Sequence, residues 1–201
     1  IPFFILAGNF LTHGGVAKRM INFATSMVGH WAGGLGLAGV LACALFAAVS
    51  GSSPATVVAI GSILLPAMVK AGFPNKFGAG VITTSGALGI LIPPSIVMVM
   101  YSVATNTSVG ALFMAGVIPG IVLASVLAGV TWYRAKKFNY PRMVKATWGE
   151  RWQAFRRSVW GLLLIVIVMG GIYSGIFTPT EAAAISAVYA FIVAVFVYKD
   201  M

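Results

Sequence analysis

A short polar segment of the sequence, Ser50-Gly51-Ser52-Ser53-Pro54, separates two long apolar stretches and carries the first groups that could do chemistry. Its hydroxyl and carbonyl oxygens are possible ligands, and its glycine and proline favour a turn over a continuous helix. Inside a membrane, non-helical backbone is tolerated only where protein buries it or where it lines an aqueous cavity. We therefore expect this segment to contact an ion or a small solute.

A second interruption lies in the range 86–95, where Pro93 and Pro94 are adjacent. Because proline has no N–H group, the carbonyls of Gly89 and Ile90 lose their usual helical donors. Hard cations such as Na⁺ bind carbonyl and hydroxyl oxygens, and unwound helices supply both in ion-coupled transporters. The alternative is that the prolines and serines only bend or join helices.

Taken together, the two interruptions predict one Na⁺ site. Its expected ligands are Ser50, Gly51, Ser52, Ser53, Gly86, Gly89 and Ile90. Further hydroxyl groups at a similar depth come from Thr56, Thr83, Thr84, Ser85 and Ser95.

The composition of the chain is that of a membrane protein. Of the 201 residues, 60% are hydrophobic and 8% are charged, with a mean hydropathy of +0.99, whereas about 25% of residues are charged in soluble domains. The net charge of +10 comes from Lys and Arg at the ends of apolar segments, where they set topology, so we expect no nucleic-acid partner. The single Cys43 excludes an intramolecular disulfide and gives no zinc pattern.

The polar segment must be positioned by the two apolar arms of a hairpin over residues 31–70. Basic residues precede and follow this hairpin, so the positive-inside bias places both outer ends on the cytoplasmic side. The first arm, 31–49, reaches about 28 Å, but the second, 55–69, reaches only about 22 Å, less than the ~30 Å hydrocarbon core. We therefore expect a re-entrant helical hairpin.

The rest of the chain alternates apolar and basic segments. Residues 1–30 predict the end of a spanning helix and an amphipathic interfacial helix, 77–105 a broken spanning helix, and 111–133 its return. Residues 134–157 carry eight Lys and Arg residues among aromatic ones, which predicts a basic cytoplasmic interfacial helix in contact with anionic lipids. Residues 158–201 predict two further spanning helices. The expected fold is an all-α, multi-spanning membrane protein.

Few other residues are candidates for chemistry. Glu181 could be a functional intramembrane acid, but Thr178-Pro179-Thr180-Glu181 equally predicts a helix start with a hydroxyl cap. His13 and His30 flank the amphipathic segment and favour an interfacial position over metal binding. No pair of acids, Ser/His pair or metal motif supports an enzyme.

Four sequence blocks in this order resemble the large membrane subunit of TRAP (tripartite ATP-independent periplasmic) transporters, the DctM-like permeases. The blocks are Ile1 to Asn9, Ser50 to Thr56, Gly86 to Ser95 and Gly175 to Ala183. The resemblance runs along essentially the whole chain. It implies a Na⁺-coupled, elevator-type secondary transporter with inverted repeats in the bacterial inner membrane.

The resemblance also implies a substrate and partners. The substrate would be a small carboxylate of the C4-dicarboxylate or sialic-acid type, delivered by a soluble periplasmic binding protein. A small four-helix membrane subunit would be the second partner, and no cofactor is expected besides Na⁺ as the coupling ion. Residues 31–133 would form the first transport-type repeat. The residues expected at the substrate are Ser52, Ser53, Pro54, Thr56, Pro94 and Ser95.

The resemblance further implies a second, inverted repeat that is not visible in this chain. We therefore expect an N-terminal half that starts within a longer protein and does not transport alone. A non-transporting membrane scaffold subunit is the alternative function, although it gives no reason for two polar interruptions that face each other. A second hairpin in opposite orientation, further along the parent reading frame, would distinguish the two.

Overall fold

The structure, a computed structural model, describes residues 2–199, and every regular element in that range is a helix. A short π-helical segment, Val193–Val197, continues the last α-helix. The α-helices are α1 (Pro2–His13), α2 (Val16–Val28), α3 (Gly34–Ser50), α4 (Ser53–Lys70), α5 (Asn75–Gly86), α6 (Leu88–Leu91), α7 (Ile96–Thr105), α8 (Val109–Lys137), α9 (Trp148–Tyr173) and α10 (Pro179–Ile192).

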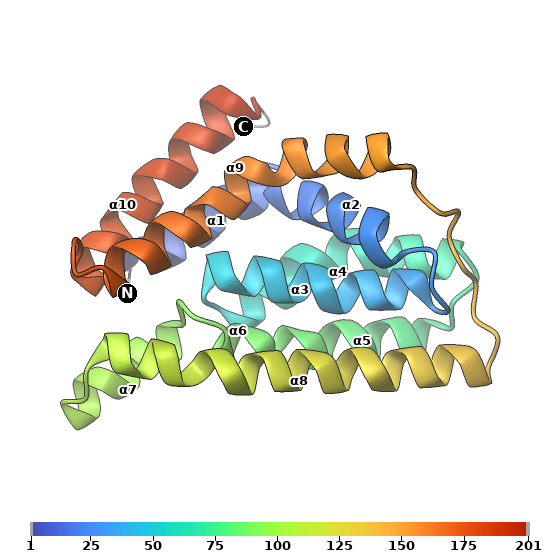
Figure 1. Cartoon of the computed structure of the whole chain (residues 1–201), viewed down its shortest axis with the longest axis horizontal. Coiled ribbons are helices and arrows are strands. Elements are labelled where there is room, and N and C mark those ends of the chain that lie inside the picture. Colours follow the sequence, from blue (N-terminus) through green and yellow to red (C-terminus); the bar gives the residue numbers. More distant parts are fainter. Residues whose placement is uncertain (1, 200–201) are drawn as a thin grey trace.

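The helices pack in two groups, one with its helices along the long axis of the molecule and one with oblique helices (Figure 1). One group contains α3, α4, α5 and α8, the other contains α1, α9 and α10, and α2 packs against both α3 and α9. Fully buried side chains of the core include Phe46 of α3, Met20 of α2 and Leu64 of α4. The core therefore holds the α3–α4 hairpin against its neighbours.

Several helices have the length and composition of membrane spans. Four segments pass by length and apolar character, namely α4, α8, α9 and Pro179–Val197. The pair formed by Asn75–Leu91 and Ile96–Thr105 passes as one span bent by 40° at a short break. This confirms the predicted all-helical, multi-spanning class and the broken helix.

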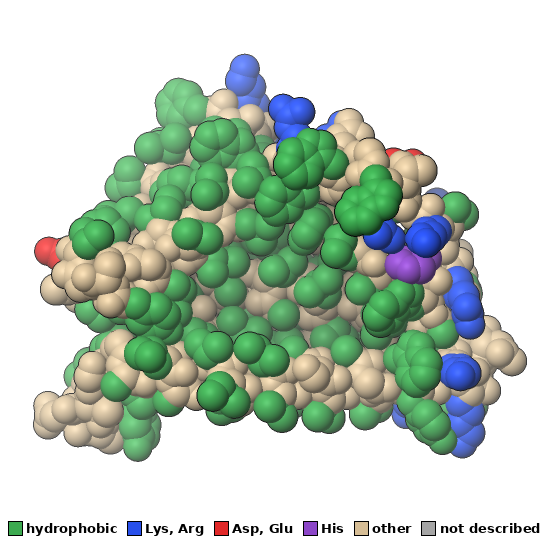
Figure 2. All heavy atoms as spheres, viewed as in Figure 1, with side chains coloured by type: hydrophobic (Ala, Val, Ile, Leu, Met, Phe, Trp, Pro, Cys, Tyr) green, Lys and Arg blue, Asp and Glu red, His purple; other side chains and the backbone are tan. Residues whose placement is uncertain are grey.

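The charged side chains are segregated from the apolar surface. Apolar side chains cover much of the face shown in Figure 2, and Lys and Arg gather along its right and upper edges. The opposite end, with the α7–α8 and α9–α10 turns, shows no Lys or Arg on this face. Such segregation is typical of a membrane protein whose basic ends lie on one side.

The hairpin arms differ from the lengths expected above. The second arm, α4, has 18 residues because Ser52 caps it and Pro54 fits its first turn, whereas α3 has 17 residues after a left-handed Gly33. At ~1.5 Å per residue, the arms span about 27 and 26 Å. The expectation that the second arm is much the shorter is wrong, and arm length no longer argues for a re-entrant hairpin.

The basic segment 134–157 also differs from expectation, because it is not a separate interfacial helix. α8 continues to Lys137, and α9 begins at Trp148 behind a capping box formed by Thr147 and Glu150. No glycine or proline interrupts 150–160, so the helix runs on without a break into the apolar part of α9.

Candidate functional site

The turn between α3 and α4 has the geometry that its residues predict. α3 ends where Gly51 adopts a left-handed backbone with a φ of 61°, which glycine reaches at no steric cost. Its N–H still donates to the carbonyl of Ala47 at 2.9 Å. Ser52 is extended, and its hydroxyl accepts a hydrogen bond from the Ala55 N–H at 3.5 Å, which caps α4. We call residues 50–56 the hairpin tip.

Two buried hydroxyl groups hold the hairpin tip together. The Ser50 and Thr56 hydroxyl oxygens lie 3.0 Å apart, and the Thr56 hydroxyl donates to the Ser52 carbonyl at 2.8 Å. Both side chains are at most 1% exposed. Both hydroxyl groups therefore donate their hydrogen bonds within the tip. Lone pairs on the two oxygens remain free to accept a hydrogen bond or to bind a cation.

The interruption between α5 and α7, which we call the proline break (residues 86–95), is irregular backbone around α6. The Ile92 N–H makes the last hydrogen bond of α6, to the Leu88 carbonyl at 2.8 Å, and the chain is then extended. The peptide bond between Pro93 and Pro94 is cis. Proline has no N–H, so neither residue can donate to the carbonyl four residues before it.

The hairpin tip and the proline break touch through their backbones. The N–H of Ile96 donates to the Gly51 carbonyl at 3.0 Å. A Cβ atom at position 51 would lie 2.7 Å from the Pro94 carbonyl oxygen, and one at Gly89 would lie 2.8 Å from the carbonyl carbon of Ser52. Only glycine allows these approaches. The structure thus brings predicted site residues from both interruptions together.

Most of the predicted site residues lie in or beside this contact. A Cβ at Gly86 would lie 3.5 Å from the Ser53 carbonyl oxygen, so the end of α5 also reaches the tip. The side chains of Pro54, which is exposed, and of Ile90, which is 40% exposed, are not buried in this contact, and the predicted ligand of Ile90 is its backbone carbonyl. The other predicted site residues are buried or half-buried, namely Ser50, Gly51, Ser52, Ser53, Thr56, Gly86, Gly89, Pro94 and Ser95.

Two hydroxyl groups on the proline break and the end of α5 have no hydrogen-bond partner within residues 2–199. They belong to Ser95, the N-cap residue of α7, and Ser85, which precedes Gly86, and both side chains are at most 1% exposed. An unpaired buried hydroxyl costs on the order of 1–3 kcal/mol. In the sequence, Ser85 is one of several hydroxyl residues at a similar depth. Its position at the end of α5, next to Gly86, distinguishes it as a candidate site residue.

Four helix ends converge on the contact. α3 and α5 end there, whereas α4 and α7 begin there. C-terminal helix ends present carbonyl oxygens with partial negative charge, and N-terminal ends present N–H groups with partial positive charge. The arrangement can therefore stabilise a cation and a carboxylate side by side.

Glu181 takes part in a helix start rather than in this contact. Its Oε2 accepts hydrogen bonds from the Thr178 N–H at 2.8 Å and the Thr178 hydroxyl at 2.9 Å, which caps α10. The structure thus supports the cap among the two alternatives. Within residues 2–199, no group of three or more His, Cys, Asp and Glu side chains could hold a metal ion.

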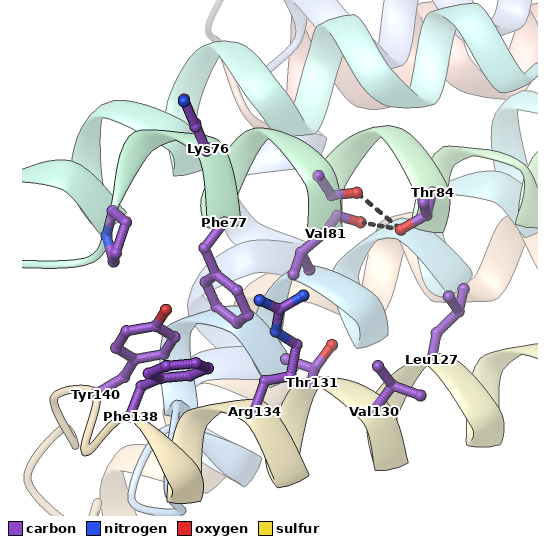
Figure 3. Close-up of a pocket in the computed structure, with 12 residues that line it drawn as sticks. Lys76, Phe77, Val81, Thr84, Leu127, Val130, Thr131, Arg134, Phe138 and Tyr140 are labelled. Atoms are coloured by element: carbon purple, nitrogen blue, oxygen red, sulfur yellow. Dashed lines mark hydrogen bonds between the residues drawn. The ribbon is translucent and has the colours of Figure 1, made fainter.

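A separate cavity of about 620 Å³ lies between α5 and α8 and contains no residue of the hairpin tip (Figure 3). The Arg134 side chain reaches from α8 toward Phe77 and Val81, and the Tyr140 ring lies 4.6 Å from that of Phe77. The Thr84 hydroxyl donates to carbonyls of its own helix. Because its walls are mainly aromatic and apolar, this cavity is not the predicted ion site.

Helices of spanning length around irregular backbone, with opposed helix ends and buried hydroxyls, are typical of membrane transport proteins. Comparison with known families narrows this class. The model of the family described as "Tripartite ATP-independent periplasmic transporter, DctM component" matches residues 1–201, so the chain belongs to this family. The resemblance found in the sequence is confirmed.

Curated relatives agree with this assignment. The chain is 74% identical to the C4-dicarboxylate TRAP transporter large permease protein DctM of Rhodobacter capsulatus, 58% to that of Pseudomonas aeruginosa, and 43% to the 2,3-diketo-L-gulonate TRAP transporter large permease protein YiaN of Escherichia coli. These matches cover 100% of the chain but 49%, 47% and 47% of the relatives, so the chain spans about half their length. The relatives are permeases rather than enzymes, and the family and the apolar helices place the chain in the inner membrane.

Proposed function

We propose that this chain is the N-terminal half, with the first structural repeat in residues 31–133, of a Na⁺-coupled, elevator-type permease that carries small carboxylates across the bacterial inner membrane. The full-length protein that would contain it is called the parent permease below. The observation that carries the proposal is the backbone contact between the hairpin tip and the proline break, together with the hydroxyls of Ser85 and Ser95, which have no hydrogen-bond partner within residues 2–199.

A Na⁺ ion suits the oxygen atoms gathered at this contact. Carbonyl and hydroxyl oxygens are the ligands of hard cations, and the C-terminal ends of α3 and α5 add partial negative charge. The proposed ligands are the tip oxygens and the carbonyls of Gly89 and Ile90, to which we add the hydroxyls of Ser85 and Ser95. Na⁺ would give a partner to two buried hydroxyl oxygens that have none among the described residues.

A carboxylate substrate suits the other two helix ends. α4 and α7 begin at the contact, and N-terminal helix ends favour anions. Ser52 and Ser53, at the start of α4, are half-buried and so within reach of a solute. C4-dicarboxylates are the preferred substrate class, since the relatives that are 74% and 58% identical carry that name. Sialic-acid-type substrates stay within the wider class of the proposal.

Two protein partners belong to the proposal. The family name describes a tripartite, periplasmic system, which supports a soluble periplasmic binding protein and a small membrane subunit beside the large one. The alternative, a non-transporting scaffold, explains spanning helices but not opposed helix ends around irregular backbone. We therefore prefer the transport function.

The test is uptake of radiolabelled succinate, a C4-dicarboxylate, into proteoliposomes that contain the parent permease and its small membrane subunit. With the binding protein outside and an inward Na⁺ gradient, we expect accumulation, and we expect it to disappear when the binding protein is omitted. The control is the same vesicle with a K⁺ gradient. Equal uptake without the binding protein, or no uptake of any C4-dicarboxylate, would contradict the proposal.

A further inference from the structure

A cavity of about 570 Å³ lies far from the hairpin tip in sequence, where α2, α9 and the end of the described chain meet. We call it the basic cavity. Segments more than a hundred residues apart contribute to it, so the fold assembles it. It is lined by Gly15, Lys18, Arg19, Asn22, Arg156, Arg157, Trp160, Val197 and Tyr198.

The lining of the basic cavity is cationic and contains no acidic side chain among residues 2–199. The nearest acid in sequence on α9 is Glu150, which lines an adjoining small cavity with Arg19 and Arg157. Its Oε2 already accepts a hydrogen bond from the Thr147 N–H at 2.9 Å, as part of the α9 cap. The four cationic side chains that line the basic cavity therefore outnumber this one neighbouring acid.

One wall of the basic cavity is held in place by Tyr198. The Tyr198 hydroxyl donates to the backbone carbonyl of Arg157 at 2.6 Å, and the Arg19 guanidinium lies 3.7 Å from the centre of the Tyr198 ring. Since Arg19 is engaged in this way, the exposed side chains of Lys18, Arg156 and Arg157 are the ones that can meet an anion.

The position of the basic cavity along α9 indicates which kind of anion fits. Immediately beyond Arg157, exposed side chains become apolar, with Trp160 42% exposed and Val166 65% exposed. On the opposing segment, Phe196 is 65% exposed. The cavity therefore lies at the border between cationic and apolar surface, which is the level of lipid headgroups, and Trp is enriched at that level.

We propose that the basic cavity binds the headgroup of an anionic phospholipid. The phosphate contacts Lys18, Arg156 and Arg157, and an acyl chain follows the apolar surface of α9 beside Trp160. A bound lipid thereby links α2 to α9 at the basic end of the molecule. The proposal does not depend on transport, because its readout is lipid binding.

The experiment measures phosphatidylglycerol retained by the parent permease after purification in detergent, by native mass spectrometry. The test variant is Arg156→Gln with Arg157→Gln. The matched control is Arg142→Gln with Lys145→Gln, which removes the same charge from exposed positions of the 138–147 segment, outside the basic cavity. We expect retention to fall by about tenfold in the test variant only, given the strength of cation contacts to anionic lipid.

A second variant, Lys18→Gln, removes a cation from α2 and keeps the proposal testable if the α9 variant unfolds. We expect it to lower phosphatidylglycerol retention too, while retention of zwitterionic phosphatidylethanolamine stays unchanged. Competition with inorganic phosphate distinguishes a lipid headgroup from a free phosphate ion as the preferred occupant of the basic cavity. We expect millimolar phosphate not to displace the lipid. Equal loss in the control variant, unchanged retention in both test variants, or displacement by free phosphate would overturn the proposal.

Discussion

Glycine residues decide how closely the two interruptions of the chain can approach. At Gly51 the left-handed backbone ends α3, and at Gly89 the missing side chain leaves room for the backbone of the hairpin tip. Neither glycine contributes a side chain to the proposed site. Both glycines are nevertheless essential to the proposed site, because they bring carbonyl and hydroxyl oxygens from separate helices to the same place.

Replacement of Gly89 by alanine tests this contact. The added Cβ would lie 2.8 Å from the Ser52 carbonyl carbon and the Ser53 nitrogen, which are backbone atoms that cannot rotate away. We expect overpacking of about 1–3 kcal/mol and a matching fall in thermal stability of the parent permease. We also expect the stabilisation by Na⁺, measured as a shift in the unfolding midpoint, to become smaller.

The matched control is Gly80→Ala in α5, where an added Cβ meets nothing within 4 Å. Alanine should leave stability unchanged or raise it by up to about 1 kcal/mol, because it favours helix over glycine. If Gly89→Ala behaved like this control, the tip and the break would not be in contact.

At the scale of elements, helix interruptions depend on neighbouring residues and can be predicted from the sequence. A glycine followed by serines and a proline, and two adjacent prolines, both disfavour a continuous helix locally, so the turn and the proline break could be placed from the sequence. The start of α4 was harder to predict. Ser52 caps the helix and Pro54 lies within its first turn, so α4 begins before the proline rather than after it. The contact of Gly89 with Ser52 depends on packing of distant segments, and no local pattern encodes it.

The environment of the hairpin tip gives a prediction about access from water. Ser50 is 1% exposed and packs against Gly8 of α1, and Figure 1 shows that the tip stops short of the end reached by the α7–α8 turn. Because the tip stops short of that end, Ser52→Cys in a Cys43→Ala background should react slowly with a membrane-impermeant maleimide added from the periplasmic side, although the Ser52 side chain is only half-buried. Lys70→Cys, at the exposed end of α4, should react readily from the cytoplasm.

This labelling tests the re-entrant hairpin, for which arm length is no longer an argument. Fast labelling of Ser52→Cys from outside, unaffected by Na⁺ or substrate, would show that the hairpin crosses the membrane completely. Labelling of Lys70→Cys only from outside would reverse the topology.

At the scale of the whole molecule, the hairpin site and the basic cavity are built from different parts of the fold and share no residue. The hairpin tip and the proline break belong to the group of α3 to α8, whereas the basic cavity joins α2 to α9. A permease that moves one helix group relative to the other would carry the hairpin site with the first group. The second group, with its cationic edge, would stay with the lipid headgroups, which is consistent with the proposed elevator mechanism.

The central claim is that hydroxyl and carbonyl oxygens at the tip and the break bind the coupling Na⁺. The most direct test is the Na⁺ concentration for half-maximal succinate uptake by the parent permease with its partners in proteoliposomes. Ser85→Ala and Ser95→Ala each remove a proposed ligand, whereas Ser62→Ala removes an exposed hydroxyl of α4 that donates to the Ala59 carbonyl.

We expect wild-type uptake to require Na⁺, and we expect each of the first two variants to raise the half-maximal Na⁺ concentration by about tenfold, equivalent to ~1.4 kcal/mol of lost binding. Ser62→Ala should leave that concentration unchanged, and the maximal rate at saturating Na⁺ should persist in all three variants. Wild-type uptake that proceeds equally well without Na⁺, or an unchanged half-maximal Na⁺ concentration in both Ser85→Ala and Ser95→Ala, would contradict the claim.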